Sequence, residues 1–149
     1  MALKPQRQVG QTVIHYSLDG VAERGHIVIS DVNDSTKVEL PGASISSTER
    51  PIGMLLTDVE DLDFTNQPEK LHRDVVASGG AVGVAMTGEF HTDAIPSGVV
   101  PSGGQVAFLA GLGRISNVQE PLGSGIVVGR FLTTADSDGF VRVAIDTVA

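Results

Sequence analysis

Short runs of hydrophobic residues recur along the chain, and glycine, proline, aspartate or asparagine stands between them. In residues 126–147 a hydrophobic run, 126–132, leads into a polar segment, and a second run, 141–145, then alternates valine and isoleucine with polar or small residues. A period of two is typical of a β-strand with one buried face. Asp138-Gly139 supplies the positive φ that a tight turn requires. We therefore predict a β-hairpin here.

Similar runs predict strands along most of the chain. The predicted strands cover residues 12–18, 25–30, 37–40, 51–57, 73–77, 81–86 continuing to 92, 104–110 and 114–116. A helical turn fits best at 64–71, where Asn66 can cap it and Pro68 lies in its first turn. No apolar stripe with helical spacing persists for three turns, so helix should be minor. Strands about ten residues apart with turn residues between them indicate an all-β barrel or sandwich.

Two segments of the chain resemble each other. Residues 52–64 and 128–140 align without a gap. The identical positions are Gly53/Gly129, Leu56/Leu132, Thr57/Thr133 and Phe64/Phe140. Each segment follows a strand that begins with glycine. The pattern predicts a weak internal repeat of a β unit, 25–64 and 104–140, although chance and the shared chemistry of hairpins could also produce it.

Composition agrees with one β domain. The chain has 149 residues, 18 glycines and no tryptophan, so its core must rest on valine, isoleucine, leucine and alanine. Cysteine is absent, which excludes disulfides, a thiol nucleophile and a cysteine-ligated zinc. No apolar run approaches the roughly 20 residues that span a bilayer, and the first residues lack an apolar signal core. We expect no membrane partner.

Charge is uneven along the chain. The net charge of −8 disfavours binding to nucleic acid, because phosphate backbones repel an acidic protein. Lys4 and Arg7, however, precede the first acidic residue, Asp19, in a polar opening segment without a period. We predict an extended N-terminal arm, residues 1–15, followed by a single β domain, residues 16–149. The arm is either a frayed terminus or a segment that becomes ordered on a partner.

Candidate chemistry is sparse. Glu89, His91 and Asp93 would share one face of a continuing strand and could bind a metal, but a solvated strand face is the favoured interpretation. The acidic run 58–63 is most simply another solvated face. Residues 136–139 resemble part of a calcium loop, but the EF-hand pattern fails at both ends, so we predict a turn.

Enzyme motifs are also missing from the sequence. It contains no nucleophile elbow, no phosphate-binding glycine loop and no Asp-Ala-Gly segment of the kind that trimeric all-β dUTPases carry. We expect no catalytic residue, no cofactor and no metal site, and we predict that the protein is not an enzyme.

The C-terminal motifs resemble those of a known family. Gly-Gly-Gln-Val-Ala-Phe-Leu at 103–109, Gly-Arg-Ile-Ser at 113–116, Val-Gly-Arg-Phe-Leu-Thr at 128–133 and Asp-Gly-Phe-Val-Arg-Val at 138–143 follow in the order found in tailed-bacteriophage head decoration, or cement, proteins. The segment 83–91, Gly-Val-Ala-Met-Thr-Gly-Glu-Phe-His, also resembles a strand motif of this family. The resemblance implies a small β-barrel or β-sandwich of the β-tulip kind. It also implies a virion protein, made in the host cytoplasm, that binds the exterior of the assembled capsid and stabilises it.

This family resemblance also implies partners, namely the major capsid protein and further copies of the chain in a homotrimer. On that basis the arm is expected to contact the shell. The predicted contact residues are Lys4 and Arg7, which would pair with acidic groups, and Val9, Val13 and Ile14, which would supply apolar anchors. The alternative is a carbohydrate- or host-surface-binding β module, such as a small head fibre or knob. The supply of aromatics, one tyrosine and five phenylalanines, argues against a sugar site.

Overall fold

The computed structural model of the chain describes residues 3–7, 12–46, 48–58, 75–76, 81–118 and 125–147. The strands are β1 (Leu3–Arg7), β2 (Thr12–Asp19), β3 (Ala22–Glu23), β4 (Ile27–Ser30), β5 (Lys37–Glu39), β6 (Pro51–Asp58), β7 (Val75–Val76), β8 (Ala81–Ala85), β9 (Thr87–Thr92), β10 (Val106–Leu109), β11 (Ile115–Ser116), β12 (Val127–Phe131) and β13 (Val141–Asp146). One short 3-10 helix, η2 (Gly111–Gly113), precedes β11. In this described part no helix is long and apolar enough to cross a membrane. The predicted all-β fold is confirmed, whereas the helical turn predicted at 64–71 lies outside the described residues.

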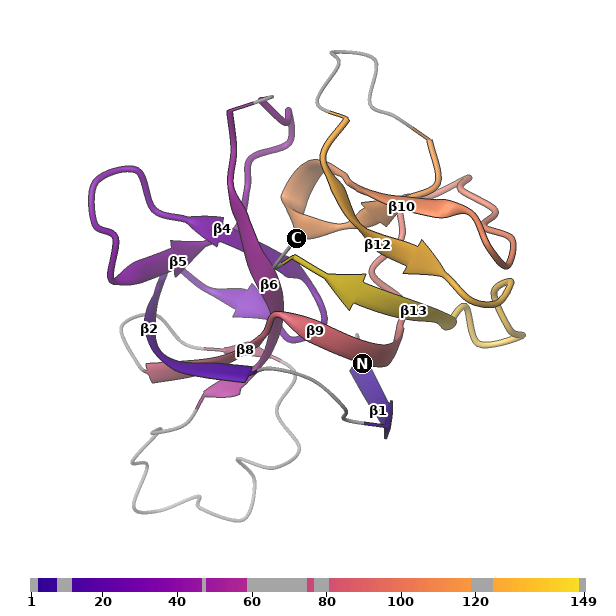
Figure 1. Cartoon of the computed structure of the whole chain (residues 1–149), viewed down its shortest axis with the longest axis horizontal. Helices are drawn as coiled ribbons and strands as arrows, with labels where there is room; N and C mark the ends of the chain where they lie inside the picture. Colours follow the sequence, from indigo (N-terminus) through magenta and orange to yellow (C-terminus); the bar gives the residue numbers. More distant parts are fainter. Residues whose placement is uncertain are drawn as a thin grey trace.

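The strands form two main bodies (Figure 1). Five of them close a barrel in the order β2-β5-β4-β6-β8. Six others form a sheet in the order β1-β9-β13-β12-β10-β11. The chain passes from barrel to sheet at Met86, which separates β8 from β9. We predicted that the strand of residues 81–86 would continue to 92; the structure instead divides it between the two bodies.

The hairpin of β12 and β13 forms as the hydrophobic pattern predicts. Its strands pair from Gly129 opposite Ile145 to Phe131 opposite Val143. In the turn, one carboxylate oxygen of Asp136 accepts the backbone N–H groups of residues 138 and 140 at 2.9 and 3.0 Å. Gly139 has a φ of 84°, which confirms the predicted left-handed position.

Two hydrophobic clusters stabilise this arrangement. The barrel interior contains the buried side chains Leu18, Ala22, Val28, Val38, Leu55, Val82 and Val84. The second cluster lies between the barrel and the sheet. From the barrel it takes Ile27, Ile29 and Met54, which alternate with the interior residues, and from the sheet it takes side chains such as Phe90 and Phe131. The sheet therefore covers one outer face of the barrel.

The barrel and the sheet share a pattern of strand pairing. Gly53 of β6 lies opposite Val28 of β4, and a bulge follows directly in β4–β6 pairing. Gly129 of β12 lies opposite Ala107 of β10, and a bulge follows at the same place. The two glycines are also the ones that the sequence alignment superimposes. The two segments thus have the same register in their strand pairs, and the internal repeat stays a prediction.

Both glycines allow a close approach of backbones. A Cβ atom on Gly53 would lie 2.3 Å from the carbonyl oxygen of Ala85, and one on Gly129 would lie 1.9 Å from that of Ala144. Contacts this short do not occur, so each position requires glycine for the neighbouring strand to pack at its observed distance.

The N-terminal residues form strands of both bodies. β1 pairs with β9, with Leu3 opposite Thr92 and Arg7 opposite Glu89. β2 begins at residue 12 and pairs with β8 and β5 in the barrel. The arm boundary that we predicted at residue 15 thus falls inside β2.

Candidate functional site

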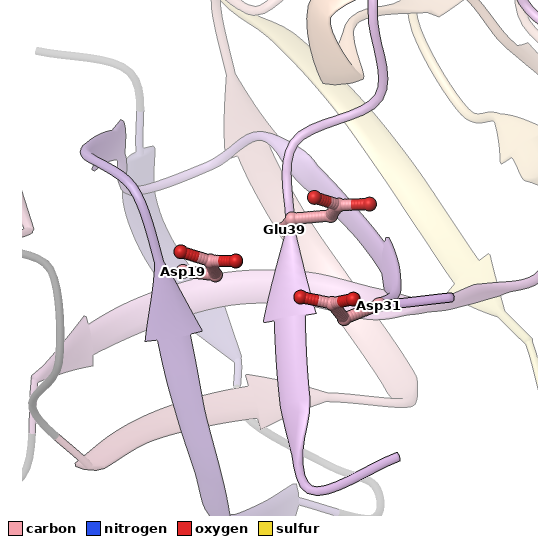
Figure 2. Close-up of side chains that lie close together, drawn as sticks. All are labelled: Asp19, Asp31 and Glu39. Atoms are coloured by element: carbon pink, nitrogen blue, oxygen red, sulfur yellow. The ribbon is translucent and has the colours of Figure 1, made fainter. Parts of the chain in front are cut away.

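Three carboxylates come together at one end of the barrel. Asp19 is the last residue of β2, Glu39 is the last residue of β5, and Asp31 directly follows β4. Their ligand oxygens lie within 4.8 Å of one another (Figure 2). The register explains this. Residues 19 and 39 are opposite each other in the parallel pair β2–β5. Residue 39 is also opposite Ile29 of the antiparallel strand β4, and residue 31 follows Ile29 by two positions.

The cluster is electrostatically unfavourable as it stands. Asp31 is only 8% exposed. Burial raises the pKa of Glu39, and the charges of Asp31, Asp19 and Glu49 raise it further. Within the described residues no lysine or arginine forms an ion pair with the three clustered carboxylates. This end of the barrel therefore presents a concentrated negative charge.

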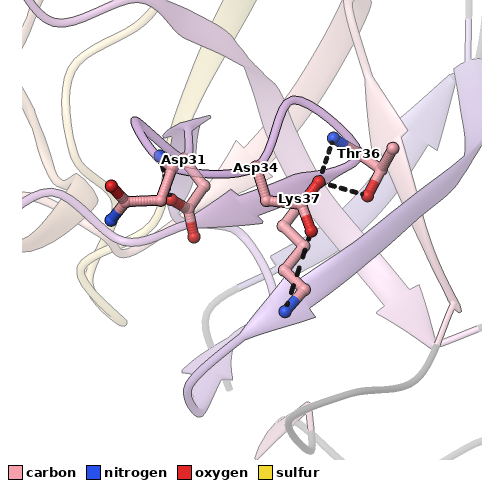
Figure 3. Close-up of polar contacts among 5 residues, drawn as sticks. Asp31, Asp34, Thr36 and Lys37 are labelled. Atoms are coloured by element: carbon pink, nitrogen blue, oxygen red, sulfur yellow. Dashed lines mark hydrogen bonds and ion pairs between the residues drawn. The ribbon is translucent and has the colours of Figure 1, made fainter.

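Hydrogen bonds in the turn between β4 and β5 hold Asp31 and Asp34 (Figure 3). The backbone N–H of Asn33 donates to Oδ1 of Asp31 at 2.8 Å. Oδ1 of Asp34 accepts the hydroxyl of Thr36 at 2.6 Å and its backbone N–H at 2.9 Å. These two bonds, the hydroxyl first, lower the pKa of Asp34. The Lys37 ammonium lies 3.9 Å from Asp34 Oδ2, so this cation forms its ion pair with the turn.

A pocket of about 620 Å³ opens beside Asp31. Its lining residues are Ile29, Ser30, Asp31, Val32, Asn33, Ser35, Thr48, Glu49 and Arg50. The Oε2 atom of Glu49 is buried and, among the described residues, has no hydrogen-bond partner. The pocket thus brings the carboxylates of Asp31 and Glu49 together with the guanidinium of Arg50.

Two kinds of group suit this arrangement. Calcium takes six to eight oxygen ligands, and a cluster of carboxylates can supply part of such a set. A guanidinium or ammonium group from another protein would also be attracted, because charge-assisted hydrogen bonds to carboxylates are strong. Sequence inspection missed the cluster because its members are far apart in the chain. The available signal was that each acid stands at or next to the end of a predicted strand.

The residues predicted to contact a capsid lie in different places. Lys4 and Arg7 are in β1, at register positions opposite His91 and Glu89 of β9. Val13 and Ile14 belong to β2 of the barrel. Val9 lies outside the described residues. The structure does not test their contact with a shell, which stays a prediction.

The other sequence candidates stay apart from the carboxylate cluster. On and after β9, Glu89 and Asp93 are exposed and His91 is partly buried. Within the described residues they are not grouped closely enough to hold an ion together. The segment 136–139 is the hairpin turn that the sequence predicted. Most of the acidic run 58–63 lies outside the described residues.

Comparison with known proteins gives a match of fold. No family model matches the chain, and no curated protein sequence matches it. Among solved structures, a chain of "The capsid of Myoviridae Phage XM1" superimposes with a TM-score of 0.67. The match covers 100% of this chain and 94% of that chain, at 12% sequence identity. The chain therefore has the fold of a phage capsid component along its whole length.

Proposed function

We propose that this chain is a structural protein of a phage virion that binds the outer surface of the assembled head and stabilises it. The observation that carries the proposal is the whole-length fold similarity to a phage capsid chain. The decoration-protein motifs at 103–143 point the same way. The chain would act as a structural protein and not as an enzyme.

The mechanism would be linkage. A protein that binds only the assembled shell stabilises that shell in proportion to its concentration and affinity. The fold suits this role, because a closed barrel and a six-stranded sheet pack on each other through one hydrophobic cluster. β1 lies at the edge of the six-stranded sheet, where a strand can exchange partners or gain one.

Shell contact is assigned to the N-terminal residues. Lys4 and Arg7 would pair with acidic groups of the major capsid protein, and Val9 would supply an apolar contact. Val13 and Ile14 belong to the part of β2 that pairs with β8 alone, because β5 joins β2 only at residues 17–19. This assignment rests on the family resemblance and on the edge position of β1.

The test uses expanded heads assembled from the capsid protein of the same phage. The full chain should cosediment with the heads and raise their melting temperature. Deleting residues 2–11 should remove binding, because β1 is lost, while circular dichroism still shows a folded β protein. Arg114→Glu, which changes an exposed arginine beside Ala43 and Pro96, is the matched control. Failure of the full chain to bind heads would overturn the function, and full occupancy by the deletion variant would overturn the arm assignment.

The alternative, a glycan-binding module, gains no support from the structure. Sugar sites commonly use exposed aromatic rings. Phe90, Phe131 and Phe140 are 1%, 0% and 7% exposed, so three of the six aromatic residues are buried by packing.

A further inference from the structure

The six-stranded sheet has one face against the barrel and an opposite face turned away from it (Figure 1). Side chains alternate along a strand, so the residues between the buried ones belong to this opposite face. In β13, for example, Arg142 and Ala144 alternate with three buried residues. Burial and strand pairing together define the outer face by Thr87, Glu89 and His91 of β9, Arg142, Ala144 and Asp146 of β13, Val127 and Arg130 of β12, and Val106 and Phe108 of β10.

The part of the outer face on β10 and β12 is largely apolar. Val106 is 37% exposed and Val127 is 53% exposed. Phe108 is directly opposite Val127 and is partly exposed. Adjacent exposed apolar side chains favour contact with another protein, because association removes them from water. This part of the outer face therefore suits an apolar partner surface.

A row of basic residues crosses the strands β13, β9 and β1. Arg142 is directly opposite His91, and His91 is directly opposite Lys4. Residues opposite each other on neighbouring antiparallel strands share a face of the sheet. In the next row along these strands, Arg7 is opposite Glu89. The register thus extends the outer face to β1 and adds two basic residues to it.

This distribution of charge differs from that of the whole chain, whose net charge is −8. The five strands carry four of the ten lysines and arginines but only two of the 18 acidic residues on this face. The four cations are Lys4, Arg7, Arg130 and Arg142, and the two acids are Glu89 and Asp146. The outer face is therefore a basic surface on an acidic protein.

Arg130 connects the apolar part of the outer face to the basic part. It is exposed, and it lies opposite Val106 of β10 on one side and Ala144 of β13 on the other. Within the described residues it forms no ion pair. A guanidinium group in this state can form charge-assisted hydrogen bonds with a carboxylate that a partner brings to it.

The chemistry of the outer face selects one kind of occupant. Nucleic acid would meet the basic row, but its phosphate backbone offers no apolar surface, and the net charge of −8 repels it. An acidic protein surface with apolar side chains beside its carboxylates satisfies both parts of the outer face. The outer face is also continuous with β1, the edge strand whose residues the proposed function assigns to shell contact.

We propose that the outer face of the six-stranded sheet docks on an acidic, partly apolar surface of the assembled head. Arg130 pairs with a carboxylate of the shell, and Val106 and Val127 pack on its apolar side chains. This inference rests on the proposed function and extends the contact from β1 across the sheet. The barrel then lies on the side away from the shell, because it packs on the opposite face of the sheet.

Affinity for expanded heads tests the docking surface. Binding of the full chain is titrated by cosedimentation, and circular dichroism checks the folding of each variant. Arg130→Glu and Val127→Asp should each raise the dissociation constant at least about tenfold, because one reverses a charge in the contact and the other buries a carboxylate against apolar side chains. Arg130→Lys keeps the positive charge and should retain most of the affinity.

Matched controls separate docking from general effects of charge. Arg114→Glu makes the same change of net charge at an exposed arginine beside Ala43 and Pro96. Val32→Asp makes the same substitution as Val127→Asp at a valine that is 87% exposed and lies next to Asp31 after β4. Both controls should bind heads as the parent does.

A footprint gives a second readout that does not depend on affinity. The chain has no cysteine, so a thiol reagent labels only a cysteine that is introduced into it. Val127→Cys and Val32→Cys are labelled with and without saturating heads, and labelling of the chain is measured by mass spectrometry. Heads should protect Val127→Cys at least about tenfold and leave Val32→Cys fully reactive, because the barrel faces away from the shell.

The outcomes distinguish this inference from the proposed function. A full chain that does not bind heads would overturn both. If the full chain binds, unchanged affinity of Arg130→Glu and Val127→Asp, or equal labelling of Val127→Cys with and without heads, would overturn the docking surface alone. Light scattering without heads adds one more outcome: self-association that both substitutions abolish would make a second copy the occupant and would also overturn it.

Discussion

Replacing Gly129 by alanine tests the close packing of β12 on β13. The added Cβ would lie 1.9 Å from the carbonyl oxygen of Ala144 and 3.0 Å from the Cα of Ile145. An ordinary contact needs more than 3.4 Å, so the strands must separate locally. Both neighbours are backbone atoms of a central strand, and no flexible side chain can move aside instead.

The magnitude follows from two contributions. Inserting a methyl group into a packed region typically costs about 1–3 kcal/mol. Separating β12 from β13 at this point also weakens one or two ladder hydrogen bonds, at about 1 kcal/mol each. We therefore expect Gly129→Ala to lower the free energy of unfolding by about 2–5 kcal/mol. Because single domains are stable by only about 5–15 kcal/mol, the loss should be easily measured.

Urea unfolding followed by circular dichroism is a suitable assay. Gly139→Ala is the matched control, because its Cβ would meet nothing within 4 Å and only the φ of 84° opposes it. That control should lower the free energy of unfolding by about 1–2 kcal/mol. Gly53→Ala, at the corresponding place in the barrel, should lower the free energy of unfolding by about as much as Gly129→Ala. Equal losses for Gly129→Ala and Gly139→Ala would refute the packing argument, since backbone conformation alone would then explain both.

Two further predictions concern charge and the turn. Because the folded state raises the pKa of Glu39 above 4.5, the folded protein keeps a proton there at pH values where the unfolded chain has lost it, so stability should fall as pH rises through that range. Glu39→Gln should remove this part of the pH dependence and be more stable than the parent at pH 7, as thermal melts across pH 4–7 would show; an unchanged slope would count against a raised pKa at Glu39, whose first cause is burial. Asp136→Ala should destabilise by about 1–2 kcal/mol, because two backbone N–H groups of the β12–β13 turn lose their acceptor. Asp136→Asn keeps an acceptor oxygen and should retain most of the stability in the same urea titration.

Local patterns in the sequence predict the strands well. The features that they miss depend on contacts between segments that are far apart in the chain. The alternation at 141–145 and the turn at 138–139 are sufficient for the hairpin, because both signals act between neighbours in the chain. The division of residues 81–92 at Met86 could not be predicted. The residues on both sides of Met86 have the composition of a strand. The break between β8 and β9 depends on the packing of the barrel and the sheet, which has no local sequence signal.

The candidate site shows the same limit. Asp19, Asp31 and Glu39 come from three strands, and their proximity depends on the parallel pairing of β2 with β5. Parallel pairing of strands that are distant in the chain has no local sequence pattern. The sequence predicts that each acid stands at or next to the end of a strand, but it does not predict that the three carboxylates lie close together.

The passage at Met86 has a mechanical consequence. One residue joins β8 of the barrel to β9 of the sheet, and the C-terminal end of the described chain fastens that junction. The backbone N–H of Thr147 donates to the carbonyl of Met86 at 3.0 Å, and its hydroxyl lies 2.6 Å from the carbonyl oxygen of Ile52. A force applied to the sheet is therefore transmitted to the barrel without a flexible linker to absorb it. We expect a protein built this way to respond to strain as one stiff body, a property that the proposed stabilisation of a phage head would require.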